Sequence, residues 1–306
     1  MILVDQPGTN RVSGEGGTTH RNQYPGGKYL YVSSMVPGQR GYILVILDVS
    51  DPRHPKEAGR LSLPSQDEKT PPSERAASYH GPTIVSPDGK SAALGFSPYV
   101  MNIDISDVTQ PKVVGKVQIT PPFIDTPGSP QAVHTVIPLW DRKLLYANSE
   151  AWAENCDDDA LNFVGLFDNK NPANPRLIST FPVPRPPAGA PYRNFCQKGG
   201  RFGPHNVSTE IHSPDVEKWG DLVYLTYFNA GLRVFDIKDP RQPTEVGWFI
   251  PPTPPKRVGP LPRTALVTQT NDVLADARGY IYITDRQWGV WILKYTGSGQ
   301  PAPTAR

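Results

Sequence analysis

Four of the six histidines in this 306-residue chain stand at equivalent points of a repeated pattern. Each stands at the head of a segment expected to form a strand, as in HGPTIV from residue 80 and HTVI from residue 134. In a fifth copy of the pattern the same position holds an asparagine. Neutral imidazole nitrogen binds Zn, Cu, Fe, Ni and Mn, so imidazoles that converge would make a transition-metal site. The five positions are His20, His80, His134, His205 and Asn271.

A ligand set of histidines with an open coordination position is suited to catalysis. We expect Fe or Cu first, with oxidoreductase or oxygenase chemistry, because neutral ligands leave the ion's charge uncompensated and favour an anion or dioxygen. Mn or Zn with lyase or hydrolase chemistry is the second expectation. The alternatives without a metal are an acid–base role and a non-catalytic interaction scaffold whose histidines only brace neighbouring sheets.

Long loops are expected to surround these histidines and to supply further groups. Glu150 follows a predicted strand and opens an acidic loop, so we expect it to act as a general base or to orient a ligand. Arg286 is the second expected catalytic residue. Guanidinium groups and aromatic rings at the same rim would suit a small anionic or aromatic substrate. The expected substrate contacts are Asn271, Trp152, Arg193, Arg201 and Trp288.

The elements that position these residues follow from a second repeated motif. An apolar run ending in aspartate and followed by a Pro-containing turn occurs four times, and a degenerate fifth copy has Lys294 at the aspartate position. A carboxylate in this place accepts hydrogen bonds from the backbone of the turn, so these aspartates are expected to be structural. They are Asp48, Asp104, Asp168 and Asp236.

Each copy lies in a longer unit that can be divided into four short strands separated by Gly, Pro and Asp. The 36 prolines argue against long helices. A four-stranded antiparallel sheet repeated along a chain is typical of a propeller blade. We therefore expect an all-β, five-bladed β-propeller over residues 1–297, with residues 298–306 as a flexible tail. A larger ring is the rival.

The blades are expected to start near residues 20, 80, 134, 205 and 271. The last unit supplies only three strands before the tail, so an N-terminal strand at residues 1–5 is expected to complete it. Such closure would cover the open edge of the sheet.

The segment LVILDVSDP, residues 44–52, resembles the repeat of the LVIVD family of β-propellers. The resemblance extends over nearly the whole chain and implies a propeller. It implies little about chemistry, because that family is largely uncharacterised and a fold does not determine a function.

Charge and cysteine content set further bounds. The 31 basic and 29 acidic residues give a net charge of +2, which makes no case for nucleic acid as a partner. No apolar stretch approaches the roughly 20 residues of a membrane-spanning helix. The guanidinium groups and aromatic rings of the rim make a small anionic or aromatic molecule the expected partner. Oligomeric state stays open. Cys156 and Cys196 form either one disulfide or two free thiols. No signal peptide is visible, and a trimmed N-terminus would be compatible with a periplasmic or extracellular location.

Overall fold

The apolar runs of the repeated motif form strands that end at the motif aspartates. β3 (Tyr42–Asp48), β7 (Tyr99–Asp104), β11 (Val164–Asp168) and β14 (Leu232–Asp236) each have the aspartate as their last residue. Each aspartate Oδ1 accepts the backbone N–H of the residue two positions later, at 2.7–3.0 Å. This local bond turns the chain at the end of each strand. The expected structural role of the four aspartates is confirmed.

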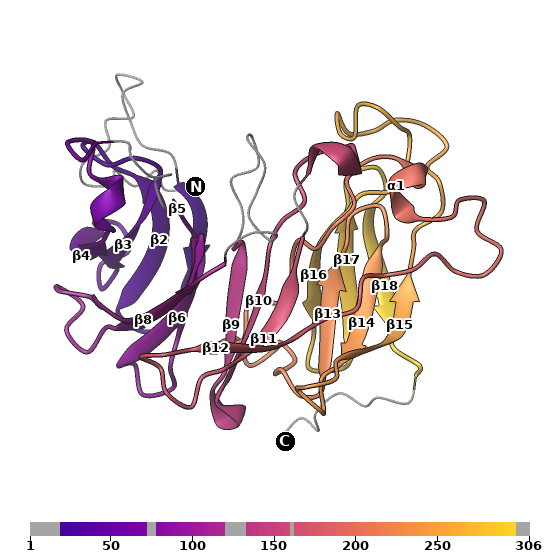
Figure 1. Ribbon diagram of the computed structural model, residues 1–306. Coiled ribbons are helices and arrows are strands. Elements are labelled where there is room, and N and C mark those ends of the chain that lie inside the picture. The colour runs from indigo at the N-terminus through magenta and orange to yellow at the C-terminus, as the bar shows by residue number, and fades with distance from the viewer. Residues whose placement is uncertain (1–18, 72–77, 120–132, 160–161, 298–306) are drawn as a thin grey trace. The chain divides into compact units, whose positions relative to one another are not determined.

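The computed structural model describes residues 19–71, 78–119, 133–159 and 162–297, and the fold is an all-β, five-bladed β-propeller (Figure 1). Besides the four motif strands, the strands are β1 (Thr19–Gln23), β2 (Tyr29–Met35), β4 (Lys56–Leu61), β5 (Ser78–Val85), β6 (Ser91–Ser97), β8 (Lys112–Gln118), β9 (Thr135–Leu139), β10 (Leu144–Asn148), β12 (Arg176–Thr180), β13 (Leu222–Thr226), β15 (Thr244–Phe249), β16 (Thr270–Ala275), β17 (Tyr280–Asp285) and β18 (Gly289–Lys294).

The sheets follow the chain in simple order. Three have four strands: β1-β2-β3-β4, β5-β6-β7-β8 and β12-β11-β10-β9. Two have three strands, β13-β14-β15 and β16-β17-β18. Helix in the described residues is limited to α1 (Phe195–Lys198) and the 3₁₀ turns η1 (Pro64–Gln66), η2 (Trp140–Arg142) and η3 (Cys156–Asp158). No helix in these same ranges has the length and apolar character needed to span a membrane.

The expected inner strand at His205 is shorter than the sequence predicts. The His205 N–H donates to the Thr226 carbonyl at 2.9 Å, and Val207 makes a single bridge to Leu225. The next carbonyl, that of Ser208, accepts instead from the Trp219 indole at 2.9 Å. The chain therefore leaves β13 after one bridge. The strand predicted at residues 1–5 and the tail at 298–306 lie outside the described residues.

The chain divides into two compact units. Unit 1 comprises residues 1–119, 133–147 and 168–176, and unit 2 comprises residues 120–132, 148–167 and 177–306. In unit 1, side chains of β3, β6 and β7 form the largest part of one apolar core, including Leu44, Leu94 and Met101. In unit 2 the core is formed by side chains of β13, β14, β16 and β17, including Val234 and Ile283. Burial of these faces is the main favourable contribution to folding.

Within unit 1 the outer strand of one sheet packs tightly on the turn of the next. A Cβ added to Gly115 of β8 would lie 2.5 Å from the carbonyl carbon of Ala173. Gly59 of β4 meets the backbone of Val108 and Thr109 in the same way. Both turns belong to motif copies, and their second polar residues, Asp107 and Asn171, also accept backbone N–H groups. Glycine is needed at these two strand positions because the neighbouring backbone occupies the space of a side chain.

Gly115→Ala is expected to lower the free energy of unfolding by about 1–3 kcal/mol, because the added methyl group overpacks a rigid backbone contact. Urea unfolding measures this loss. Val114→Ala, at the exposed neighbouring position of β8, is the control and should change stability far less. Equal effects of the two substitutions would contradict the close-packing argument.

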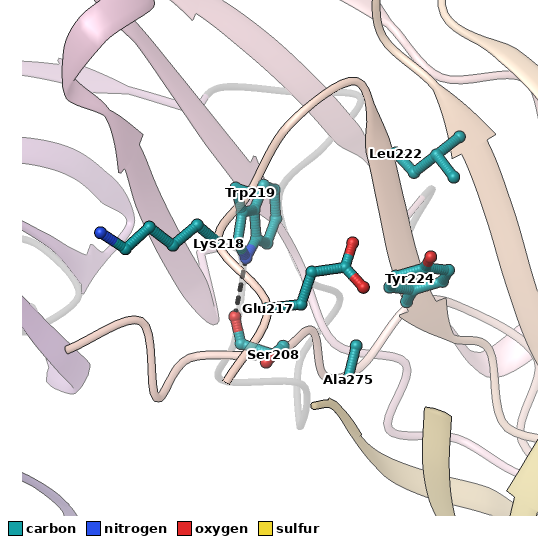
Figure 2. Close-up of a pocket in the computed structure, with 7 residues that line it drawn as sticks. All are labelled: Ser208, Glu217, Lys218, Trp219, Leu222, Tyr224 and Ala275. Carbon is teal, nitrogen blue, oxygen red and sulfur yellow. Dashed lines mark hydrogen bonds between the residues drawn. The ribbon is translucent and has the colours of Figure 1, made fainter. Parts of the chain in front are cut away.

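Unit 2 contains a water-sized cavity of about 10 Å³ beside the Glu217 carboxyl group. Figure 2 shows this carboxyl group directed toward Tyr224, while Lys218 extends the other way. Glu217 is 7% exposed, and neither its Oε2 nor the Ser208 Oγ has a hydrogen-bond partner within the described part of the chain. Burial, and then the nearby negative charge of Asp276, raise the pKa of Glu217 to about 7. The neutral acid is therefore the form that this cavity favours.

We expect stability to fall as pH rises from about 4.5 toward 7, because the folded chain holds the Glu217 proton that the unfolded chain has released. The total loss is at most about 3 kcal/mol. Glu217→Gln should remove this part of the pH dependence, measured by urea unfolding at pH 5 and pH 8. The exposed Glu68→Gln is the control and should keep it. Parallel pH profiles for wild type and Glu217→Gln would show that the buried acid is not responsible.

Candidate functional site

Irregular pairing marks the inner strands at the positions singled out in the sequence. In β1 the register shifts between Thr19 and Asn22, which brackets His20. In β5 it shifts between Tyr79 and Thr83, which brackets His80, and in β16 it shifts around Asn271. A bulge bends a strand locally and redirects the side chains at that point. Three of the five equivalent positions, His20, His80 and Asn271, therefore share a local irregularity of the backbone.

Unit 1 brings three of the predicted imidazoles together. The ring centroids of His20 and His80 are 4.4 Å apart, and those of His80 and His134 are 3.8 Å apart. His80 and His134 are buried, and His20 is exposed. A row of three neighbouring imidazoles is unfavourable when all are protonated, so the arrangement favours neutral rings.

The Nδ1 atoms of three histidines contact oxygen atoms, from the next residue at His80 and His134 and from β16 at His205. His80 Nδ1 lies 3.2 Å from the Gly81 carbonyl, and His134 Nδ1 lies 2.8 Å from Thr135 Oγ1. In unit 2, His205 Nδ1 lies 2.6 Å from the Asn271 carbonyl. A carbonyl can only accept, so at His80 and His205 the proton belongs on Nδ1 and a neutral ring carries its lone pair on Nε2. The Asn206 amide nitrogen also lies 3.0 Å from His205 Nδ1, and its donor bond goes to the same Asn271 carbonyl at 3.1 Å. Metal-binding histidines commonly use the second nitrogen in this way.

Unit 2 places a buried carboxyl group beside the fourth histidine. Glu150 Oε1 lies 3.4 Å from His205 Nε2 and 3.4 Å from Arg201 Nη1, and Trp152 Nε1 donates to Glu150 Oε2 at 3.2 Å. Burial raises the pKa of Glu150 to about 7, against the positive charges of Arg201 and Arg286, which lower it. A carboxyl group in this state can hold or release a proton near neutral pH.

The Phe228 ring contacts His205 and two guanidinium groups of unit 2. Its ring stacks on His205 with centroids 4.7 Å apart, and the guanidinium carbons of Arg201 and Arg286 each lie 5.5 Å from its centre. Arg286 Nε donates to Asn271 Oδ1 at 2.8 Å. Burial, and then the charge of Arg201, lower the pKa of Arg286. Two guanidinium groups on one apolar surface make a region suited to an anion.

The sequence-predicted site residues thus fall into groups. Five of them, Glu150, Trp152, Arg201, Arg286 and Asn271, are linked with His205 in unit 2 by the contacts above. Arg193 is exposed and precedes α1, and its backbone N–H donates to Oε1 of Gln197 within that helix. Trp288 donates its indole N–H to the Pro252 carbonyl at 2.7 Å and contacts the Trp291 ring. The described contacts of these last two residues therefore lie away from Glu150.

Sequence reasoning missed Phe228. It follows β13 in the segment YFNAG, residues 227–231, which forms the turn before β14, and its φ is 43°. Nothing in the residue pattern distinguishes this phenylalanine from a core residue. The available signal was its place in a turn between two predicted strands, because turn residues often carry binding groups.

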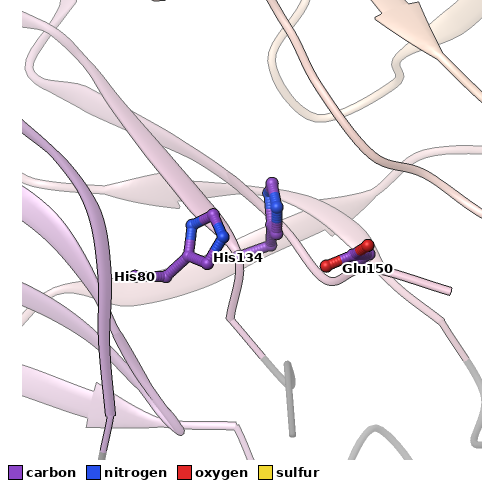
Figure 3. A group of neighbouring side chains, drawn as sticks. All are labelled: His80, His134 and Glu150. Atoms are coloured by element: carbon purple, nitrogen blue, oxygen red, sulfur yellow. The ribbon is translucent and has the colours of Figure 1, made fainter. Parts of the chain in front are cut away.

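His80 and His134 of unit 1 are both buried, and their rings are close neighbours (Figure 3). Both histidines come from segments that the sequence analysis identified as inner-strand heads. Two neighbouring imidazoles supply nitrogen ligands that suit Zn and non-haem Fe.

The loop that carries Trp152 is tied to two other loops of unit 2. Cys156 and Cys196 form a disulfide across a sequence separation of 40 residues, which settles the open choice between bridge and free thiols. The Glu154 carboxylate accepts the backbone N–H groups of Arg263 and Thr264, each at 2.8 Å. These ties limit how far the loop can move relative to α1 and to the segment before β16.

A family model for the LVIVD repeat matches residues 26–62 and 212–250. The chain carries LVIVD repeats. Together with the five-bladed architecture this agrees with the resemblance noted in the sequence, and these LVIVD repeats contain the motif strands β3 and β14. Among curated proteins, none matches the chain.

Two solved structures are similar to this LVIVD-repeat chain in fold. A hypothetical selenium-binding protein from Sulfolobus tokodaii is 13% identical with a TM-score of 0.55, over 91% of this chain and 58% of that one. A protein from Lactobacillus plantarum is 10% identical with a TM-score of 0.55, over 90% of this chain and 66% of that one. This chain spans less than two thirds of either structure. At such identities the likeness shows the fold alone.

Arg201→Met is expected to destabilise the chain by about 1–3 kcal/mol more at pH 8 than at pH 5, because the ionised Glu150 loses a buried cationic partner. At pH 5 the Glu150 carboxyl is neutral and the loss is smaller. Unfolding in urea with a chelator present measures both values. In a Glu150→Gln background the effect of Arg201→Met should not depend on pH. A pH-dependent effect in that background would contradict the pairing.

Proposed function

We propose that this propeller is a metalloenzyme that binds a transition-metal ion through the neighbouring imidazoles His20, His80 and His134 of unit 1. His205 of unit 2, with the Glu150 carboxyl group beside it, is the further ligand that the sequence predicts. The observation that carries the proposal is the hydrogen bonding of the rings. At His80 and His205 a backbone carbonyl accepts from Nδ1, so Nε2 is the nitrogen that would bind the ion. The close spacing of the three imidazoles in unit 1 supports the same conclusion.

The electrostatics at His205 also support a bound cation. A neutral His205 presents an Nε2 lone pair 3.4 Å from a Glu150 oxygen. Two acceptors at this distance repel each other unless a proton or a metal ion lies between them. Either cation would relieve the repulsion, and the metal would do so without requiring Glu150 to stay protonated.

We propose oxidoreductase or oxygenase chemistry with Fe or Cu, on a small anionic or aromatic substrate. A bound ion would supply Lewis acidity and redox chemistry at the histidines. Arg201 and Arg286 would bind a carboxylate or other anionic group of the substrate, because the Arg286 Nη1 is buried and has no acceptor within the described residues. Trp152 would pack on the apolar part of the substrate, and Asn271 would orient Arg286 through its Oδ1.

The second candidate is a lyase or hydrolase that uses Mn or Zn as Lewis acid. The buried Glu150 favours it, because a carboxyl group that titrates near neutral pH is a suitable general base. The two candidates share the ligand set and differ in the metal and in the need for an electron acceptor. Selenium binding, named for the Sulfolobus protein, is not carried over, since that likeness shows the fold alone.

Purified protein is expected to contain about one equivalent of Fe or Cu by elemental analysis, and the double variant His80→Ala, His134→Ala should contain less than about a tenth of that. Loss of two of the ligands removes most of the coordination energy. The control is His54→Ala, an exposed turn histidine paired with Asp51.

The remaining outcomes separate the alternatives. About one equivalent of Mn or Zn, lost in the same double variant, would favour the lyase or hydrolase. A wild-type protein that stays metal-free after incubation with each of the four ions would contradict the proposal and favour the non-catalytic scaffold. A His205→Ala variant that keeps full metal content would remove His205 from the ligand set.

A further inference from the structure

A second cavity in unit 2 has no histidine among its described lining residues and has the size of a small-molecule site. Its volume is about 310 Å³, near the lower end of the range for ligand pockets. The Cys156–Cys196 disulfide forms part of its lining, and Phe202 and Tyr227, with ring centroids 5.4 Å apart, form another part. Val183, which is 56% exposed, lines it from a more open position.

The walls of this cavity are held in place before any ligand binds. The disulfide joins the loop at Cys156 to α1. Phe202 also stacks on the buried Phe195 ring of α1, at 5.3 Å between centroids, and this contact holds the Phe202 ring in place. A cavity with walls fixed in this way costs little ordering entropy on binding.

The lining has one charged residue among those the structure describes, Asp159. Its Oδ2 accepts the backbone N–H groups of Trp152 at 2.8 Å and Ala153 at 3.1 Å, which fixes the carboxylate at the cavity. An anion beside aromatic rings and a disulfide offers two complementary interactions. The rings favour a planar apolar group, and the carboxylate with the ring faces favours an ammonium group.

We propose that this cavity binds a small aromatic amine, with the aromatic ring of the ligand against Phe202 and Tyr227 and its ammonium group toward Asp159. None of its described lining residues is among the proposed metal ligands, although Asp159 also accepts the backbone N–H of Trp152 and its charge acts on Glu150. The disulfide makes the site dependent on oxidation state, because reduction separates Cys156 from Cys196 and releases a wall of the cavity.

The test compares three probes of similar size, benzylamine, benzyl alcohol and benzoate, by ligand-observed NMR on the full oxidised chain. Benzylamine is expected to bind about tenfold or more tightly than benzyl alcohol, as one charge-assisted hydrogen bond implies, and benzoate more weakly than either. Equal binding of all three probes, or none at millimolar concentration, would overturn the proposal.

Two variants separate the site from non-specific binding. Asp159→Asn keeps an oxygen for the two backbone N–H groups but removes the charge, so benzylamine should fall to the affinity of benzyl alcohol. Val183→Trp fills the cavity from an exposed position and should weaken benzylamine and benzyl alcohol alike, whereas Val258→Trp, at another exposed valine, should change nothing. Benzylamine binding that persists in Val183→Trp, or that is unaffected by dithiothreitol, would contradict this location.

Discussion

The carboxylate that closes each motif turn is the interaction on which the rest of this structure depends. Asp48, Asp104, Asp168 and Asp236 each end a strand by accepting a backbone N–H two residues on. The turn that follows is the surface against which the glycine of a neighbouring outer strand packs in unit 1, as at Gly59 and Gly115. A short-range hydrogen bond thus shapes the turn on which the next sheet of unit 1 packs.

Polar chemistry is concentrated at the heads of those inner strands, and a bulge recurs there. An extra residue in a pairing leaves backbone groups unpaired and turns a side chain away from the regular alternation. At His80 the freed Gly81 carbonyl accepts from the ring nitrogen itself, so the irregularity that positions the imidazole also determines its tautomer. At His205 the tautomer is likewise determined by a backbone carbonyl, since the Asn271 carbonyl accepts the ring N–H.

Unit 2 balances several buried charges around one apolar ring. Glu150, Arg201 and Arg286 lie near Phe228 and His205, and the positive groups outnumber the carboxylate. Burial raises the pKa of Glu150 and lowers that of Arg286, since both charged forms lose hydration. A cluster of this kind is costly for folding alone. The loops that surround it are tied by a disulfide and by Glu154.

The residue pattern by itself determined the repeat, the strand ends at the motif aspartates and the equivalence of His20, His80, His134 and Asn271, because these depend on local hydrogen bonding and on period. It could not show that the inner strand at His205 would reduce to a bridge, since Trp219 competes for the Ser208 carbonyl from a distance in sequence. Nor could it distinguish Phe228 from a core residue, pair Cys156 with Cys196, or separate Arg201 from Arg193. Those outcomes were decided by tertiary structure, because contacts between loops far apart in the chain leave no period in the sequence to read.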